Sequence, residues 1–394
     1  MALEPSSLEP SVAALRRVVD LARAGLVERE SLVEAIVLAA VAGEHVLVIG
    51  PPGTAKSEAV RRVARGLGGA YFEYLLGRFT EPNEIFGPID LRRLRDGVVE
   101  TVTTGMLPEA ELAFLDEVFL GSTAILNTLL GILNERTFRR GSTVVRCPLR
   151  VCVGASNALP EDESLAAFAD RFLVRVFVEP VGDAFLEALL EGGWAIERAA
   201  AIEAVGMLPL DELARAARAV DLGPARPALA HAVRRLRQAG VTLPDRRIVR
   251  VQRLVAAAAV LDGRMTATSA DLWPIVLAVQ TPEGQSLARE ALGELLAATS
   301  NQTLIAAAAE ASSGPLARAA RIVEIGRAVL AARPEGGGGA EVGAADPEAL
   351  GAWRRRVEGI ARDIDAGFPT NAHPPALADL RRDVVAALGP PTTP

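Results

Sequence analysis

Lysine is almost missing from this 394-residue chain. Of its 42 basic residues one is a lysine, Lys56, and the other 41 (42 − 1) are arginines. Such a bias is typical of a GC-rich genome, yet the surviving lysine lies in the segment GPPGTAKS. A phosphate loop needs a compact ammonium group on a flexible stem, and the guanidinium fork of arginine is too wide for it. The position of this lysine therefore indicates a phosphate site.

The chain is also poor in cysteine, histidine and aromatic residues. Its two cysteines, Cys147 and Cys152, exclude a disulfide framework, and we expect both to be small buried thiols. The three histidines lie far apart in the sequence, which argues against a transition-metal centre. Aromatic residues make up 4% of the chain and hydrophobic residues 50%, so we predict a core of alanine, leucine, valine and isoleucine.

The charge balance is acidic, and no targeting segment is evident. A net charge of -7 and a pI near 5.3 argue against general binding to nucleic acid or to an anionic membrane, because both need a basic face. The N-terminal sequence lacks the basic start and apolar core of a secretory signal. No apolar run approaches the length of a membrane span. We therefore expect a cytoplasmic protein.

Apolar strands alternate with helices in the first part of the chain. Two helices are predicted within residues 11–43, before the first strand. The predicted strands are 45–50, 70–76, 112–118, 150–157 and 173–180. Strands separated by helices are typical of a parallel sheet covered on both faces. The fold class is therefore α/β, with a parallel five-stranded P-loop sheet and flanking helices in a domain at 1–180.

Two segments interrupt this alternation, and the rest of the chain is helical. Hairpins are predicted around Asp96-Gly97 and around Arg140-Gly141. The regions predicted after the sheet are an all-α lid at 181–285, a helical extension at 286–335, a flexible linker at 336–346, and C-terminal helices with a tail at 347–394. In the last region an apolar stripe from Leu350 to Ile364 predicts an amphipathic helix. This helix is either a docking element for a partner or, as we prefer, folded back onto its own core.

The segment around Lys56 follows a strand and opens a helix, which is the context that a phosphate loop requires. Backbone N–H groups there would hold the β-phosphate, Lys56 would bridge the β- and γ-phosphates, and the Ser57 hydroxyl would hold Mg²⁺. Ala55 replaces the usual glycine, and we expect a slightly tighter loop rather than lost binding. The predicted nucleotide-binding residues here are Gly50, Pro51, Pro52, Gly53, Thr54, Ala55, Lys56, Ser57 and Glu58.

Asp116 and Glu117 end the apolar strand LAFLDE. Charges at the carboxyl end of a buried strand face the ligand crevice of an open α/β sheet. Asp116 would bind Mg²⁺ through water, and Glu117 would orient and deprotonate an attacking water. An acidic turn after a strand is common by itself, but together with the phosphate loop the pair indicates ATP hydrolysis.

Each of three further positions is explained either by an ordinary structural role or by a functional one. Asn157 ends the fourth strand, where it either holds the attacking water or forms a turn. Arg171 precedes the fifth strand and by pattern alone is a solvated surface arginine. Arg246 and Arg247 begin a helix of the second domain, where two exposed basic residues are unremarkable.

Taken together, these motifs resemble the AAA+ superfamily, and within it the MoxR family with RavA-like features. The resemblance is carried by GPPGTAKS, FEYLLGRFTEPNEIFGPI, TGMLPEAELAFLDEV, ILNTLLGILNERTFRRG, VGASNALP and LVRVFVEP with its preceding DRF. It covers residues 15 to about 280. The long stretch between the second and third strands is more specific than the phosphate loop, which many unrelated NTPases share.

The resemblance implies several residue roles. Asn157 resembles sensor 1, and Arg171 resembles the arginine finger that completes a neighbouring subunit's site. Arg246 fits sensor 2 best, with Arg247 as the alternative, and would touch ATP from a lid above Lys56. The two hairpins resemble the helix-2 insert and the pre-sensor-1 hairpin. A site that needs a neighbour's arginine implies a homo-oligomeric ring, usually a hexamer.

The resemblance also implies a role and partners. MoxR-like proteins use ATP and Mg²⁺ to remodel or mature other proteins, usually with a partner that carries a von Willebrand factor A domain. An alternative is a nucleic-acid motor or loader of the same clade, since arginines lie in both hairpins, although the acidic charge disfavours it. A nucleotide-gated scaffold with little turnover is disfavoured by Glu117 and Arg171. The sequence does not identify the client protein.

Overall fold

The computed structural model describes residues 8–198, 202–334, 347–368 and 374–388. The chain divides into two compact units. The first takes in Met1–Pro180 and Arg198–Ser312, and the second Val181–Glu197 and Ser313–Pro394. Both candidate sites described below lie in the first unit.

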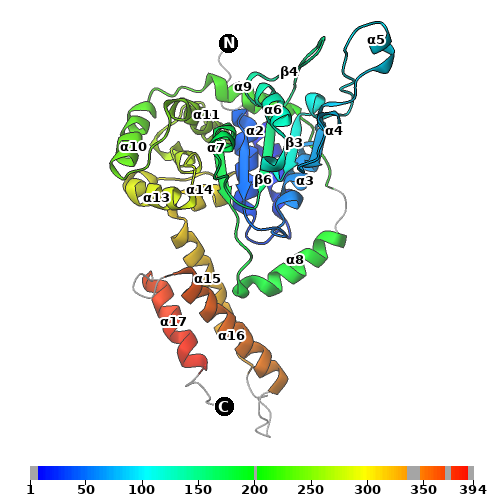
Figure 1. The fold of residues 1–394 in the computed structure, drawn as a ribbon. Helices are drawn as coiled ribbons and strands as arrows, with labels where there is room; N and C mark the ends of the chain where they lie inside the picture. The colour runs from blue at the N-terminus through cyan, green and yellow to red at the C-terminus, as the bar shows by residue number, and fades with distance from the viewer. Residues whose placement is uncertain (1–7, 199–201, 335–346, 369–373, 389–394) are drawn as a thin grey trace. The chain divides into compact units, whose positions relative to one another are not determined.

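The first unit is built on a parallel sheet in which β6 is the central strand (Figure 1). The strands are β1 Val46–Ile49, β2 Tyr71–Leu75, β3 Leu112–Asp116, β6 Val151–Ser156 and β7 Val174–Phe177. They are ordered β2-β3-β6-β1-β7, and every neighbouring pair is parallel. All four residues of β1 are buried, as expected for a strand covered on both faces. The predicted α/β fold with five parallel strands is confirmed.

Helices connect these strands and cover the sheet. They are α1 Glu9–Arg23, α2 Glu30–Ala42, α3 Lys56–Leu67, α6 Thr123–Glu135 and α7 Glu163–Ala169. Helix α2 contacts β1, β6 and β7, and it also packs against α1 and α3. Leu129 and Ile132 of α6 share a core cluster with Leu47 and Leu115 of the sheet. The parallel order therefore places the carboxyl ends of β1, β3 and β6 at one edge, beside the phosphate loop.

Two inserts extend from this sheet, and the first differs from the prediction. The hairpin expected around Asp96-Gly97 is one antiparallel bridge, Ile89 to Thr101, with a short helix α5, Leu91–Arg95, between its arms (Figure 1). The reason is local, because the Asp90 side chain accepts hydrogen bonds from the backbone N–H groups of Arg92 and Arg93. This cap starts a helical turn where we expected strand.

The second insert is the predicted hairpin. Strands β4, Thr137–Arg140, and β5, Thr143–Arg146, pair antiparallel, and Gly141 adopts φ +59 in the turn. A left-handed φ favours glycine, which is why Arg140-Gly141 marked this turn in the sequence. Thr101 N donates to Thr143 Oγ1 at 2.7 Å, so the two inserts are bonded to each other.

A helical region completes the first unit. Its helices are α9 Leu208–Ala219, α10 Arg226–Gln238, α11 Asp245–Leu261, α12 Pro274–Leu277, α13 Pro282–Leu296 and α14 Ile305–Ser313. Helices α9 and α11 pack on α2, and α9 also packs on α1. Ala307 N donates to the buried carboxylate of Glu34 at 2.7 Å, which ties α14 to α2. This helical region, which overlaps the all-α lid predicted at 181–285 and continues to residue 312, is called the lid below.

The second unit changes two predicted boundaries. Residues 181–197, expected to begin the lid, instead group with the C-terminal helices, and the extension predicted at 286–335 divides near residue 313. The carboxylate of Asp363 accepts hydrogen bonds from Asp183 N and Ala184 N, which explains the grouping. The helices are α8 Leu186–Arg198, α15 Pro315–Ala331, α16 Pro347–Gly367 and α17 Pro375–Leu388. The linker predicted at 336–346 lies outside the described residues.

The apolar stripe of α16 is covered within its own unit. Trp353, Val357, Ile360 and Ile364 are buried, and α16 packs against α15 and α17. The preferred interpretation, that this helix folds back onto its own core, is confirmed, and this face of α16 is not a free docking surface. None of the described helices has the length and apolar character that a membrane span needs.

Candidate functional site

The phosphate loop connects β1 to α3 at the carboxyl edge of the sheet. Gly50 N donates to Ser156 O at 3.1 Å, and a Cβ at Gly50 would lie 2.2 Å from Val178 O, so only glycine fits there. Lys56 is 7% exposed, and its Nζ donates to Gly50 O at 2.7 Å and to Pro51 O at 2.9 Å. The loop therefore wraps around the lysine ammonium.

Ala55 differs from the expectation of a merely tighter loop. It adopts φ +58 and ψ 24, the left-handed region, immediately before α3. A side chain with a Cβ costs roughly 1 kcal/mol or more in that region, whereas glycine enters it freely. Alanine in place of the usual glycine therefore raises the energy of the backbone conformation, rather than narrowing the loop. The sequence contained this signal, since glycine is the residue that left-handed positions favour.

Asp116 and Glu117 reach the same edge from the end of β3. Burial lowers the pKa of Lys56, and the negative charges of Asp116 and Glu117 oppose that shift, so the two carboxylates lie within electrostatic reach of its ammonium group. Glu117 adopts φ +49, a left-handed conformation that turns the chain sharply after the strand. The two carboxylates on which the sequence interpretation depends thus lie near Lys56 at this edge of the sheet.

Asn157 joins this group from the end of β6. Its Nδ2 donates to Glu117 Oε1 at 2.6 Å, and the residue is exposed. This bond joins the amide to the carboxylate that we predict to activate water. Strand β6 lies between β1 and β3, so the sheet order itself brings Asn157 between the loop and the acid pair.

Ser57 and Asp116 supply the oxygen donors that a magnesium ion prefers. Ser57 is in the first turn of α3 and Asp116 ends β3, both at this edge of the sheet. Within the described residues no group of three or more histidine, cysteine, aspartate or glutamate side chains is arranged to hold a metal. Magnesium commonly takes one or two protein oxygens and completes its shell with substrate phosphates and water, so the two residues fit that ion.

Arg29 supports the loop and was not predicted from the sequence. It is 4% exposed, its Nε donates to Thr54 O at 2.7 Å, and its Nη2 donates to Glu179 O at 2.7 Å. Burial lowers its pKa. The guanidinium thus ties the phosphate loop to the chain that leaves β7. In a sequence with 41 arginines, nothing marked this one, because it lies well before the motif.

Arg171 lies at the opposite edge of the sheet. It precedes β7, which is parallel to β1, with Val46 opposite Val174. A strand of this length spans roughly 13 Å, so Arg171 is separated from the phosphate loop of its own chain by the sheet. Its Nε is buried and has no hydrogen-bond partner in the described part of the chain, and burial, followed by the charge of Arg246, lowers its pKa.

A basic pocket of about 860 Å³ opens at this second edge. Its lining includes Arg146, Arg171, Arg218, Arg246 and Arg250. Among the described lining residues, Glu44 is the single acid. A concave site lined by many guanidinium groups and a single acid is suited to an anion.

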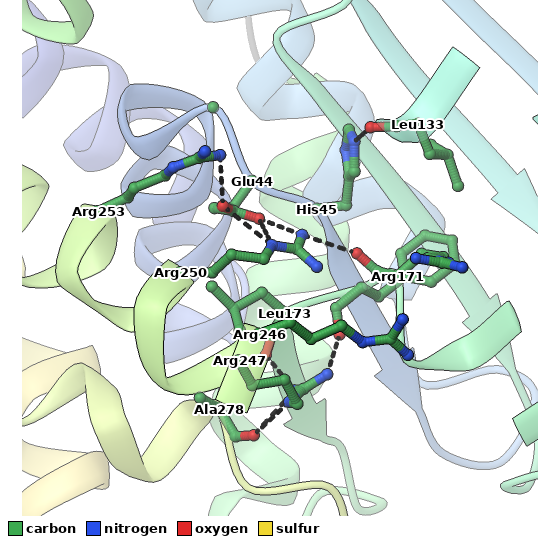
Figure 2. Close-up of polar contacts among 12 residues, drawn as sticks. Glu44, His45, Leu133, Arg171, Leu173, Arg246, Arg247, Arg250, Arg253 and Ala278 are labelled. Atoms are coloured by element: carbon green, nitrogen blue, oxygen red, sulfur yellow. Dashed lines mark hydrogen bonds and ion pairs between the residues drawn. The ribbon is translucent and has the colours of Figure 1, made fainter. Parts of the chain in front are cut away.

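Arg246 differs from its predicted position. Its Nε donates to Asp170 Oδ2 at 2.6 Å, beside Arg171 (Figure 2 shows both arginines). The sensor 2 candidate therefore lies at the Arg171 edge, and the expectation that it touches ATP above Lys56 of the same chain is wrong. Helix α11 begins next to the segment before β7 rather than over the phosphate loop, which is a consequence of lid packing that the motif does not encode.

Arg247, the alternative sensor candidate, lies in the interior of the protein. It is fully buried, and its guanidinium donates to Leu173 O at 2.6 Å, to Ala278 O at 2.8 Å and to Asp170 Oδ1 at 2.9 Å (Figure 2). Its donors are used inside the protein, whereas Arg246 is exposed to the pocket. This contrast favours Arg246 for any contact with a ligand.

Comparison with known proteins extends these observations. The family model described as the MoxR domain in the MoxR-vWA-beta-propeller ternary systems matches residues 13–215. Two uncharacterized proteins of Methanocaldococcus jannaschii are 35% and 36% identical over 246 and 249 residues, each match covering 62% of this chain. The chain spans 64% and 65% of those relatives, which is less than two thirds of their length.

A named relative and a solved structure are more distant. The chaperone MoxR1 of Mycobacterium tuberculosis is 28% identical over 182 residues, which is 45% of this chain and 46% of that protein. The crystal structure of a proposed ATPase from Cytophaga hutchinsonii aligns with a TM-score of 0.59 at 15% identity, over 75% of this chain and 98% of its own. At that identity the likeness supports the fold alone.

Proposed function

The chain belongs to the MoxR family of AAA+ ATPases, in the group named for MoxR-vWA-beta-propeller systems, and we propose that it hydrolyses ATP in a homo-oligomeric ring to remodel partner proteins. The observation that carries this proposal is the convergence of Lys56, Asp116, Glu117 and Asn157 at one sheet edge. The RavA-like assignment within the family stays a prediction.

Each residue of the phosphate edge has a defined task in this proposal. Lys56 and the loop N–H groups bind the β- and γ-phosphates, and in doing so Lys56 exchanges its backbone acceptors for phosphate oxygens. Ser57 and Asp116 would hold Mg²⁺, which neutralises charge on the phosphate oxygens. Glu117 takes the proton of the attacking water, and its bond to Asn157 Nδ2 fixes the carboxylate in place.

The arginine edge completes a neighbour's site rather than its own. Arg171 and Arg246 share the basic pocket, and the sheet separates them from Lys56 of the same chain. We therefore assign both to action in trans, on the γ-phosphate bound by the adjacent copy. An arginine supplied in this way typically accelerates phosphoryl transfer by about 10³-fold or more. This requirement is the argument for a ring, and a hexamer is the size that the family resemblance implies.

The partner proposal rests on the family description. A protein with a von Willebrand factor A domain is the expected partner, because the matching family is named for systems that contain one. The two inserts, α5 with its bridge and the β4–β5 hairpin, are bonded to each other and together would transmit the nucleotide state to a client. A chaperone-like role is consistent with the name of the mycobacterial relative.

Substitution of Glu117 tests the hydrolysis proposal. Glu117→Gln keeps the size of the side chain and removes the base, so ATP should bind while turnover falls by about 10²-fold to 10⁴-fold. The measurement is phosphate release together with the nucleotide retained after gel filtration. Unchanged turnover in the Gln variant would reject Glu117 as the base, and a wild-type chain without Mg²⁺-dependent hydrolysis would reject the proposed activity.

A further inference from the structure

The short segment that carries Arg171 is held by one helix of the lid. The backbone carbonyls of four consecutive residues, 170 to 173, each accept a hydrogen bond from an arginine of α11. Arg247 takes three of them, at 3.2 Å, 3.2 Å and 2.6 Å, and Arg250 Nη2 takes the carbonyl of Arg171 at 3.0 Å. The backbone on either side of Arg171 is therefore fixed to α11.

Arg250 is itself fixed from a third element. The carboxylate of Glu44, which is 1% exposed, accepts from Arg250 Nε at 3.0 and 3.2 Å and from Arg253 Nη1 at 3.1 Å. Figure 2 shows the Arg250 guanidinium between the Glu44 carboxylate and the Arg171 carbonyl. Because Glu44 lies two residues before β1, this bridge joins the lid, the sheet and the Arg171 segment.

From this geometry we propose that Arg250 is a positioning residue for the trans-acting Arg171, with Glu44 as its anchor. The proposal rests on the assignment of Arg171 to a neighbour's site. Arg250 need not touch the nucleotide itself, since its guanidinium bonds to Glu44 and to the Arg171 backbone. Any shift of α11 relative to the sheet would move the Arg171 carbonyl with it. The lid of one copy thereby sets how far its arginine reaches into the next copy.

The reaction rate depends strongly on the position of an arginine that contacts the transition state. A displacement of about 1 Å in a catalytic constellation can lower the rate on the order of 10²-fold. Loss of the Arg250 bridge should therefore reduce the help that a subunit gives to its neighbour. It should leave the subunit's own phosphate loop unaffected, because that loop lies at the other edge of the sheet.

Mixed rings separate these two effects. Arg171→Ala subunits serve as acceptors that bind ATP, and Lys56→Ala subunits serve as donors that supply Arg171. A donor that also carries Arg250→Gln should restore at least about ten-fold less turnover than the Lys56→Ala donor. The KM for ATP of the mixture should not change, since the acceptor's loop is intact. In the reverse arrangement, Arg250→Gln placed in the acceptor should change the restored turnover by no more than about twofold.

Two further variants control for folding. Arg250→Lys keeps a positive charge opposite Glu44 but lacks the fork that reaches both the carboxylate and the Arg171 carbonyl, so it should also fail as a donor. Arg253→Gln removes the other Glu44 contact, made by a side chain that is 63% exposed, and should donate normally. Thermal melting and ATP binding of each variant establish that the subunits are folded.

The outcomes are distinct. Restoration by the Arg250→Gln donor equal to that of the plain donor overturns the positioning role and leaves the proposed function intact. Equal losses in both arrangements also overturn it, because a general structural defect would act on either subunit. If even the plain Lys56→Ala donor restores nothing, the shared-site function fails, and the positioning role fails with it.

Discussion

The two edges of the central sheet differ in how the sequence encodes them. The phosphate edge comes from short contiguous motifs at the carboxyl ends of strands β1, β3 and β6. The arginine edge is assembled from separated places in the chain: Glu44, the Asp170 segment and helix α11. The first edge is placed to bind an anion within its own chain, whereas the second lines a pocket with several guanidinium groups, of which Arg246 and Arg250 are paired with carboxylates. Local motifs thus specify the site that binds the anion, and tertiary packing specifies which arginines are available to a neighbouring copy of the chain.

Loss of the lysine should have the largest effect on binding. Lys56→Ala removes the ammonium group that the loop encloses, so we expect ATP affinity to fall by at least about 30-fold. Arg171→Ala, at the other edge, should leave the affinity of an isolated subunit unchanged. Isothermal titration of both variants measures the difference. Equal losses of affinity would remove the distinction between the two edges.

The two edges should also differ in how much stability their acids provide. Asp170 pairs with the fully buried Arg247 and also accepts from Arg246 and Gln280. Asp170→Asn leaves a buried arginine uncompensated and should cost about 3–5 kcal/mol of unfolding free energy. Asp116→Asn should cost less than about 1 kcal/mol, because that acid serves a ligand. Urea denaturation gives both values, and a reversed order would contradict this interpretation.

A pH effect should arise from Glu34, away from both edges. Burial raises the pKa of this carboxyl group from 4.5 to about 7, although Ala307 N and Arg23 partly stabilise its charge. Between these two pH values the folded state binds more protons than the unfolded state, so stability falls as the pH rises. The loss amounts to at most about 3 kcal/mol above pH 7. Glu34→Gln should raise the melting temperature at pH 8 and leave it almost unchanged near pH 5.

The smallest expected effect is at the phosphate edge itself. Ala55→Gly places the residue that favours φ > 0 at a position with φ +58, and should stabilise the fold by up to about 1 kcal/mol. The gain is limited because glycine also increases the entropy of the unfolded chain. Thermal melting of the variant without nucleotide tests this. A lower melting temperature would mean that the alanine methyl makes a contact worth more than the backbone energy.

The features that could be predicted from the sequence are those that depend on residues close together in the chain. The five strands, their parallel arrangement and the hairpin at Arg140-Gly141 follow from apolar runs and turn residues. The convergence of Lys56, Asp116 and Asn157 follows as well, because the carboxyl ends of parallel strands meet at one edge. Each of these features is determined within a few residues of its motif.

What the sequence did not predict depends on contacts between distant residues. The position of Arg246 is set by its ion pair with Asp170, 76 residues earlier in the chain. Arg29 reaches Glu179 across 150 positions, and residues 181–197 join the C-terminal helices through Asp363. In a chain where 41 arginines look alike, only the folded structure distinguishes the fully buried Arg247 from the exposed Arg246.

The most direct test of the central claim is the ATPase activity of mixed subunits. Arg171→Ala and Lys56→Ala are each nearly inactive alone in this account, because one lacks the donated arginine and the other cannot bind ATP. Mixed in equal amounts, they should recover a measurable fraction of wild-type turnover, since an intact phosphate edge then meets an intact arginine edge. A mixture no more active than its two components would contradict a site shared between copies.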